Sequence, residues 1–218
     1  MEARVTAIEA RRGTRARRIF LDGEPWRSLP AEVIGATELF VDDVVDVSDL
    51  ETRIAEVEPG LAYRRALGLL SRRDYSITSL TERLRRDGYS LDAVDACVTR
   101  LRETKLLDDV RYAEALVRSL RRRGLGGRRV ALELTRRGLE AGALEHQDVE
   151  EPSESERAFA LARKLARQGD EVPRLTAKLV RRGFDTPLAL QAARAALNAP
   201  EWPDEAPGEC SGEYPAEG

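Results

Sequence analysis

Arginine pairs are the residues of this chain whose types and spacing best suit a chemical task. A guanidinium group donates two parallel hydrogen bonds to a phosphate or a carboxylate, so neighbouring arginines indicate binding of an anionic partner. We therefore predict a basic binding face, without catalysis, between residues 72 and 182. Its candidate residues are Arg72, Arg73, Arg85, Arg86, Arg121, Arg122, Arg123, Arg128, Arg129, Arg136, Arg137, Arg181 and Arg182.

The charge of the chain is unevenly distributed, although the net value is only −3. Residues 61–140 carry 19 basic and 11 acidic side chains, and residues 157–199 carry 9 and 3. The segments 1–60, 141–156 and 200–218 have an excess of acidic residues. Basic blocks with acidic flanks predict a polyanionic or acidic partner, and acidic flanks that compete with this partner for the same basic surface. The alternative is that the arginines are solvated and paired with glutamates on helix faces.

Other residues that suggest catalysis have simpler explanations. His146 is the only histidine, which excludes a His-based triad and a multi-histidine metal site. Asp108 and Asp109 are better explained as helix caps than as paired catalytic carboxylates. The stretch 124–129 lacks the Lys-Ser/Thr that completes a P-loop, although the amides at a helix start, with Arg128 and Arg129, suit a phosphate. We expect no enzymatic activity, no cofactor and no metal.

Three similar stretches must position most of these arginines: 80–89, 130–139 and 175–184. In each, an apolar residue stands four positions before a leucine, and that leucine stands four positions before a glycine. This spacing places both apolar side chains on one helix face. Glycine is the expected helix stop because it adopts the left-handed C-cap conformation without strain. Arginines just before it are favoured by the helix dipole.

The copies belong to larger repeated units. Tyr63, Tyr112 and Phe159 precede the three glycines by 25, 26 and 24 residues. Recurrence at about 45–50 residues is typical of stacked supersecondary units. We predict a mainly α-helical fold of three tandem three-helix bundles that form a curved solenoid. The expected bounds are 59–107 for repeat 1, 108–148 for repeat 2 and 149–199 for repeat 3.

The two ends differ from the repeats. Residues 1–58 contain alternating apolar stretches, and Asp22-Gly23 is a strong signal for a two-residue hairpin turn. We predict a small β-rich N-terminal domain, with Pro30 opening a short helix and a further strand near residues 44–47. Residues 200–218 hold four prolines and six acidic residues without a cation, which predicts a disordered acidic tail.

The composition also limits the expected cellular location of the protein. No apolar run approaches the roughly 20 residues that span a bilayer, and the chain does not begin with the apolar core of a signal peptide. Cys97 falls in an expected helix and Cys210 in the expected tail, so we predict no disulfide. We expect a cytoplasmic monomer without membrane contact.

Three stretches together resemble the RecX regulatory proteins: 69–76 (LLSRRDYS), 80–89 (LTERLRRDGY) and 106–113 (LLDDVRYA). The resemblance covers residues 60–140 well and the third unit more loosely. Residues 1–50 resemble the β-containing leader of some members of the family. The acidic stretch from Glu145 to Glu156 departs from the family pattern.

The resemblance implies a modulator of the RecA recombinase. Members are similar in having three tandem three-helix units that lie along the groove of the RecA filament on single-stranded DNA, and they usually inhibit its growth, strand exchange and ATP hydrolysis. Composition and spacing by themselves predict only helical repeats and a basic face. Two alternatives therefore stay open: a DNA-binding protein that coats nucleic acid, and a helical scaffold for another acidic protein.

Overall fold

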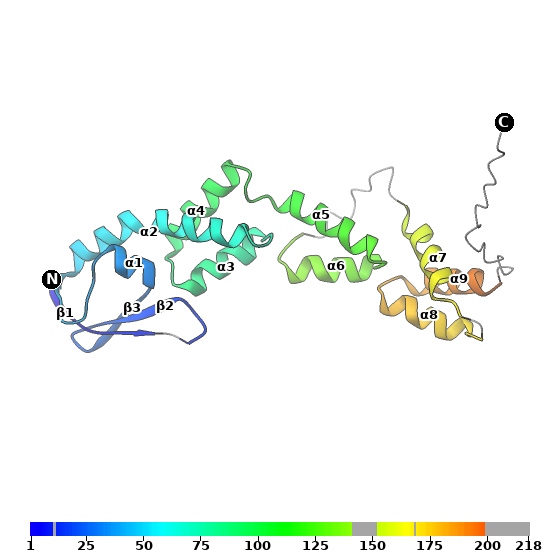
Figure 1. The fold of residues 1–218 in the computed structure, drawn as a ribbon, viewed down its shortest axis with the longest axis horizontal. Helices are drawn as coiled ribbons and strands as arrows, with labels where there is room; N and C mark the ends of the chain where they lie inside the picture. The colour runs from blue at the N-terminus through cyan, green and yellow to red at the C-terminus, as the bar shows by residue number, and fades with distance from the viewer. Residues whose placement is uncertain (11, 141–151, 168, 199–218) are drawn as a thin grey trace, which may run out of the picture. The chain divides into compact units, whose positions relative to one another are not determined.

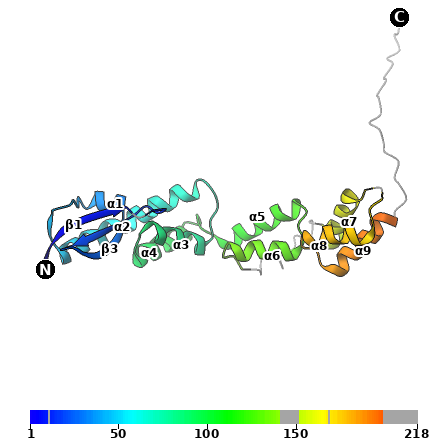
Figure 2. The same cartoon turned by 90° about the horizontal axis from the view of Figure 1, so that it is seen from below.

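The structure is a computed structural model and describes residues 1–10, 12–140, 152–167 and 169–198. The chain divides into two compact units, Met1–Glu151 and Pro152–Gly218. Each unit is described by itself below (Figures 1 and 2).

The first unit begins with a four-stranded antiparallel sheet in the order β3-β2-β1-β4. Its strands are β1 (Glu2–Ala10), β2 (Ala16–Leu21), β3 (Glu24–Pro30) and β4 (Val44–Asp46). Asp22 and Gly23 join β2 to β3 with φ angles of 48° and 85°, the left-handed conformation that a tight two-residue hairpin needs. The predicted hairpin and its Asp-Gly turn are therefore confirmed. The short helix α1 (Ala31–Ala36) follows Pro30, also as predicted.

A long helix, α2 (Val47–Leu70), connects the sheet to the first repeat. Its N-terminus is capped by Asp46, whose side chain accepts hydrogen bonds from two backbone amides of the first turn. The expected β-rich domain covered residues 1–58, so the first half of α2 was not predicted as a helix. The expected domain boundary at residues 58 and 59 lies inside this continuous helix, and the domain bounds stay predictions.

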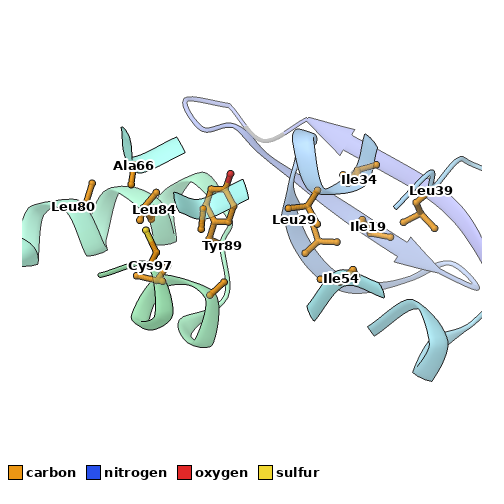
Figure 3. Packing of buried hydrophobic residues seen from close by; sticks show 14 of the residues in the cluster. Ile19, Leu29, Ile34, Leu39, Ile54, Ala66, Leu80, Leu84, Tyr89 and Cys97 are labelled. Carbon is orange, nitrogen blue, oxygen red and sulfur yellow. The ribbon is translucent and has the colours of Figure 1, made fainter. Parts of the chain in front are cut away.

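The first repeat is completed by α3 (Ile77–Asp87) and α4 (Leu91–Glu103). One continuous apolar cluster contains residues of the sheet, α1, α2, α3 and α4. Figure 3 shows part of it, with Ile19, Leu29 and Ile54 near the sheet and Leu84 and Cys97 between the repeat helices. The N-terminal sheet and the first repeat thus share one core.

The second repeat contains α5 (Asp109–Arg122) and α6 (Gly127–Arg136), which lie side by side over a separate apolar cluster. The second unit contains α7 (Glu154–Leu165), α8 (Val172–Arg181) and α9 (Thr186–Asn198) around a third cluster. The expected last helix of repeat 2 and the expected acidic tail fall in residues 141–151 and 199–218, outside the described part of the chain.

The helices α3, α6 and α8 end in the same way, which confirms that they are equivalent. Gly88, Gly138 and Gly183 have φ angles of 104°, 68° and 95°. The amide of the next residue donates to the carbonyl of the leucine four positions before each glycine, at 3.2, 3.0 and 3.3 Å. The apolar residue after each glycine is buried. These are the bonds of the Schellman motif.

Side chains cap several of the helix starts. Ser76 and Ser153 form capping boxes, Ser90 caps α4, and Asp108 caps α5 by accepting from the Arg111 amide at 3.0 Å. The fold is therefore mainly helical, with tandem three-helix domains and a small N-terminal antiparallel sheet, as predicted. The curvature of the solenoid stays a prediction.

Candidate anion-binding site

Most of the predicted binding arginines have exposed side chains. Among the thirteen, Arg182 is half-buried and Arg121 is buried, with 8% of its surface exposed. Arg121 lies four residues after the buried Val117 of α5, so it belongs to the core-facing side of that helix. Its burial argues against a place on an exposed face. The gathering of the other arginines on one face stays a prediction.

Alignment of the repeats on their glycines shows which arginines are equivalent. The position two before the glycine is Arg86, Arg136 or Arg181, and all three side chains are exposed. The position directly before the glycine differs, because repeat 1 has Asp87 where the others have Arg137 and Arg182. The arginine two residues before the glycine is therefore the shared basic feature of the repeats.

Asp87 has a structural role that its sequence pattern did not predict. Its carboxylate is buried, and Oδ2 accepts from Arg65 Nε at 2.9 Å and lies 2.8 Å from Arg65 Nη2. Arg83 Nη2 lies 3.4 Å from the other carboxylate oxygen. The break in the Arg-Arg-Gly pattern at this position was the only available signal in the sequence.

The junction between repeats 1 and 2 lies within the first unit. The Ser76 hydroxyl at the start of α3 donates to the carbonyl of Arg137 at the end of α6. The Ile77 amide donates to Asp109 Oδ1 at 2.9 Å. Burial raises the pKa of the Asp109 carboxyl above its ordinary value, although the Ile77 amide acts in the opposite direction. Asp108 thus caps α5, as the capping interpretation predicted, whereas Asp109 accepts from the first amide of another helix, α3, a contact that was not predicted.

Gly138 allows the close approach at this junction. A Cβ atom at Gly138 would lie 2.8 Å from Thr78 Cβ, and its φ of 68° is unfavourable for other residues. We expect Gly138→Ala to lower the free energy of unfolding by about 1–3 kcal/mol, because backbone strain and overpacking add. Urea unfolding of the full chain measures this loss.

Gly23→Ala is the matched control for that substitution. Gly23 also has a positive φ, of 85°, but a Cβ there has no atom within 4 Å. It therefore tests the backbone strain without the collision. Equal losses in the two variants would show that the contact with Thr78 contributes nothing.

A cavity of about 540 Å³ opens beside this junction. Arg73 and Tyr75, which precede α3, line one side, and Tyr112 of α5 with Arg136 and Arg137 at the end of α6 line another. The structure thus brings together three of the predicted binding arginines from two repeats. The other ten are absent from its lining.

Aromatic side chains hold two of these guanidinium groups. Arg137 Nη1 donates to the Tyr112 hydroxyl at 2.8 Å. The Arg73 guanidinium carbon lies 4.3 Å from the centroid of the Tyr75 ring, a cation–π contact. Arg136, in contrast, is 3.3 Å from the carboxylate of Glu133. The cavity therefore presents two oriented cations whose contacts leave their charge unneutralised, an arrangement that suits an anion.

The described residues contain neither a metal-binding cluster nor a membrane-spanning helix. No group of three or more His, Cys, Asp or Glu side chains there is arranged to hold a metal ion. No helix in the same part of the chain is both long and apolar enough to cross a membrane.

Comparison with protein families gives two matches. Residues 62–101 match the model of the first three-helix domain of RecX, and residues 108–145 match that of its second three-helix domain. These ranges overlap the two repeats of the first unit and include all three arginines that line the cavity.

Curated relatives and solved structures are similar over longer stretches. Regulatory protein RecX of Stenotrophomonas maltophilia (strain K279a) is 38% identical over 139 residues, which is 60% of this chain and 84% of the relative. Regulatory protein RecX of Corynebacterium efficiens is 32% identical over 167 residues, or 69% and 79% of the two chains.

Two crystal structures have a similar fold. A regulatory protein RecX has a TM-score of 0.52 at 24% identity, with 85% of this chain and 96% of the other covered. RecX from Lactobacillus salivarius has a TM-score of 0.57 at 21% identity, with coverages of 64% and 96%.

Proposed function

The chain belongs to the RecX family of regulatory proteins, and we propose that it binds the RecA recombinase filament on single-stranded DNA and modulates its growth, ATP hydrolysis and strand exchange. Inhibition is the expected direction. In this proposal the chain is a non-enzymatic regulator that acts as a monomer in the cytoplasm. Its partners are RecA and the DNA within the filament.

One observation carries the proposal beyond family membership. Arg86, Arg136 and Arg181 occupy the same position in three repeats, and each is exposed at the end of an equivalent helix. A filament presents the same anionic groups repeatedly along its length. A chain with one basic position per repeat is suited to engage several of them at once, so that modest contacts combine into strong binding.

The proposed mechanism follows from this distribution of charge. Basic repeats that contact neighbouring RecA protomers and nearby DNA phosphates would stabilise one arrangement of the filament relative to others. A ligand shifts a conformational equilibrium only by its difference in affinity for the two states. Binding to the arrangement that neither adds protomers nor turns over ATP would therefore inhibit both processes.

We expect the double substitution Arg85→Glu, Arg86→Glu to raise the concentration needed for half-inhibition of RecA ATPase by about tenfold. Both side chains are exposed, so the fold should be kept. The measurement is RecA ATP hydrolysis on single-stranded DNA, titrated with substoichiometric amounts of the full chain. Circular dichroism and thermal melting check that the variant is folded.

The matched control is Arg17→Glu with Arg18→Glu. These two arginines are exposed on β2, and their reversal changes the net charge equally but lies outside the repeats. Inhibition by the control should stay near that of the unaltered chain. If reversal at Arg85 and Arg86 leaves inhibition intact, the assignment of the basic face is wrong.

A second arm of the same titration separates filament binding from simple coating of DNA. Coating predicts inhibition that is relieved by excess single-stranded DNA and that depends steeply on salt. Regulation of the filament predicts inhibition at substoichiometric amounts of the chain, which are too small to coat the DNA.

A further inference from the structure

We propose that the cavity between repeats 1 and 2 binds one phosphodiester group of single-stranded DNA, together with the sugar next to it. This inference deepens the proposed function and rests on it. The cavity gives the chain a direct contact with DNA that does not require RecA.

The orientation of its arginines supports this assignment. Arg73 comes from the segment before α3, and Arg137 comes from the end of α6, so the two guanidinium groups reach the cavity from different repeats. A guanidinium has five N–H donors in a fixed planar array. Tyr112 accepts a hydrogen bond from Nη1 of Arg137, while Arg73 stacks on Tyr75 without using its donors. Both groups are thus oriented and keep donors for a ligand.

The charge around the cavity matches a phosphodiester. Three arginines line the cavity, Arg73, Arg136 and Arg137. Glu133 lies 3.3 Å from Arg136 but also 3.7 Å from Arg129, so it offsets the charge of Arg136 only in part. Asp74 also lines the cavity and adds one negative charge, so the balance lies between one and two positive charges. A phosphodiester carries one negative charge, whereas a terminal phosphate carries nearly two at neutral pH. The carboxylate of Asp74 repels a terminal phosphate more strongly than it repels a phosphodiester.

The size and the other walls favour a nucleotide unit over an acidic side chain. The volume of about 540 Å³ lies within the range of pockets for small molecules, about 300–1,000 Å³. A single carboxylate would leave much of it unfilled. Ser79 and Ser119 add hydroxyl groups to the lining, and Leu116 adds an apolar surface against which a sugar can pack.

The junction beside the cavity keeps the two arginines at a set separation. The hydrogen bond from the Ser76 hydroxyl to the backbone carbonyl of Arg137 joins the start of α3 to the end of α6. Because this bond uses the backbone of Arg137, its side chain can be replaced without loss of the bond. The cavity can therefore be tested by substitution at Arg137 and Arg73.

The test measures binding of a fluorescein-labelled oligodeoxythymidine to the full chain by fluorescence anisotropy, without RecA. We expect Arg73→Gln with Arg137→Gln to weaken binding about tenfold at fixed salt. The slope of the logarithm of affinity against the logarithm of salt concentration should become shallower by about one. Arg17→Gln with Arg18→Gln removes the same charge outside both the cavity lining and the repeats, and should weaken binding much less.

Tyr112→Phe tests orientation separately from charge. It removes the oxygen that accepts from Arg137 and leaves every charge in place. We expect a loss of affinity smaller than that of the double variant, with an unchanged salt slope. The proposal is overturned if the cavity variants bind the oligonucleotide as tightly as the unaltered chain, or if the two double variants weaken binding equally. Either result would indicate diffuse electrostatic attraction.

Competition experiments identify the source of the anion. Thymidine 5′-monophosphate should displace the oligonucleotide only weakly, since its terminal phosphate is nearly a dianion. Strong displacement would assign the cavity to free nucleotides and overturn the proposal. The cavity variants could instead lose binding of polyglutamate while their DNA binding stays unchanged. This result would assign the cavity to an acidic protein segment and would also overturn the proposal.

RecA ATPase measurements with the same variants keep the two proposals distinct. If the unaltered chain binds DNA through the cavity but has no effect on RecA, the proposed function fails and the cavity assignment stands. If the chain inhibits RecA and the cavity variants bind DNA normally, the cavity assignment fails and the proposed function stands.

Discussion

Asp87→Ala is expected to lower the free energy of unfolding of the first unit by about 3–5 kcal/mol. The substitution removes a buried carboxylate and leaves the Arg65 guanidinium, itself only 15% exposed, without its counter-ion. Arg83 loses its neighbour as well. The cost arises mainly from the unpaired buried cation, because the attraction within the pair is largely offset by desolvation when both partners are present. Urea unfolding followed by far-ultraviolet circular dichroism gives the loss.

Two further variants show whether the ion pair explains that loss. Asp95→Ala removes an exposed acidic residue of α4 and should change stability by less than about 0.5 kcal/mol. Asp87→Leu combined with Arg65→Met replaces both partners by apolar groups and should recover much of the lost stability. If Asp87→Ala costs no more than the Asp95 control, the carboxylate does not stabilise the unit.

Local features of this fold were predictable because they depend on residues close in sequence. The left-handed glycines Gly88, Gly138 and Gly183, each with a leucine four residues earlier, define helix ends through contacts within one turn. The hairpin at Asp22-Gly23 depends on two residues only. These signals predicted the tandem repeats and the N-terminal hairpin without information on tertiary contacts.

The first half of α2 was not predictable in the same way. Residues 47–58 contain several acidic residues and precede Pro59, which is unfavourable inside a helix. This segment is stabilised by contacts with residues elsewhere in the chain. Leu50 and Ile54 pack into the shared core, and the buried carboxylate of Glu58 accepts from the amide and the hydroxyl of Ser90, at 2.8 and 2.7 Å.

The candidate site also combines features that local sequence predicts with features that depend on tertiary contacts. The sequence singled out Arg73 and Arg137 separately, as members of basic pairs. Their meeting at one cavity depends on the bond between Ser76 and the carbonyl of Arg137, 61 residues apart, and no local pattern predicts such a contact. The burial of Arg121 could have been predicted, because helical periodicity places this residue on the same face as Val117.

Leu84→Ala is expected to destabilise the first unit by about 2–5 kcal/mol, through lost burial and the cavity left in the core. Leu84 is fully buried in the cluster that the first repeat shares with the sheet (Figure 3). Unfolding of the sheet should therefore shift together with unfolding of the repeat helices. Trp26 of β3 packs against this cluster, so its fluorescence reports on the sheet.

The second tryptophan, Trp202, is replaced by Phe in every variant so that the signal comes from Trp26 alone. Leu132→Ala is the control, because Leu132 is 42% exposed and its truncation should cost far less. In Leu84→Ala, the Trp26 fluorescence and the circular dichroism should move to lower urea by the same amount. A Trp26 transition that stays in place while the helical signal shifts would show that the sheet folds independently of the first repeat, despite the core they share.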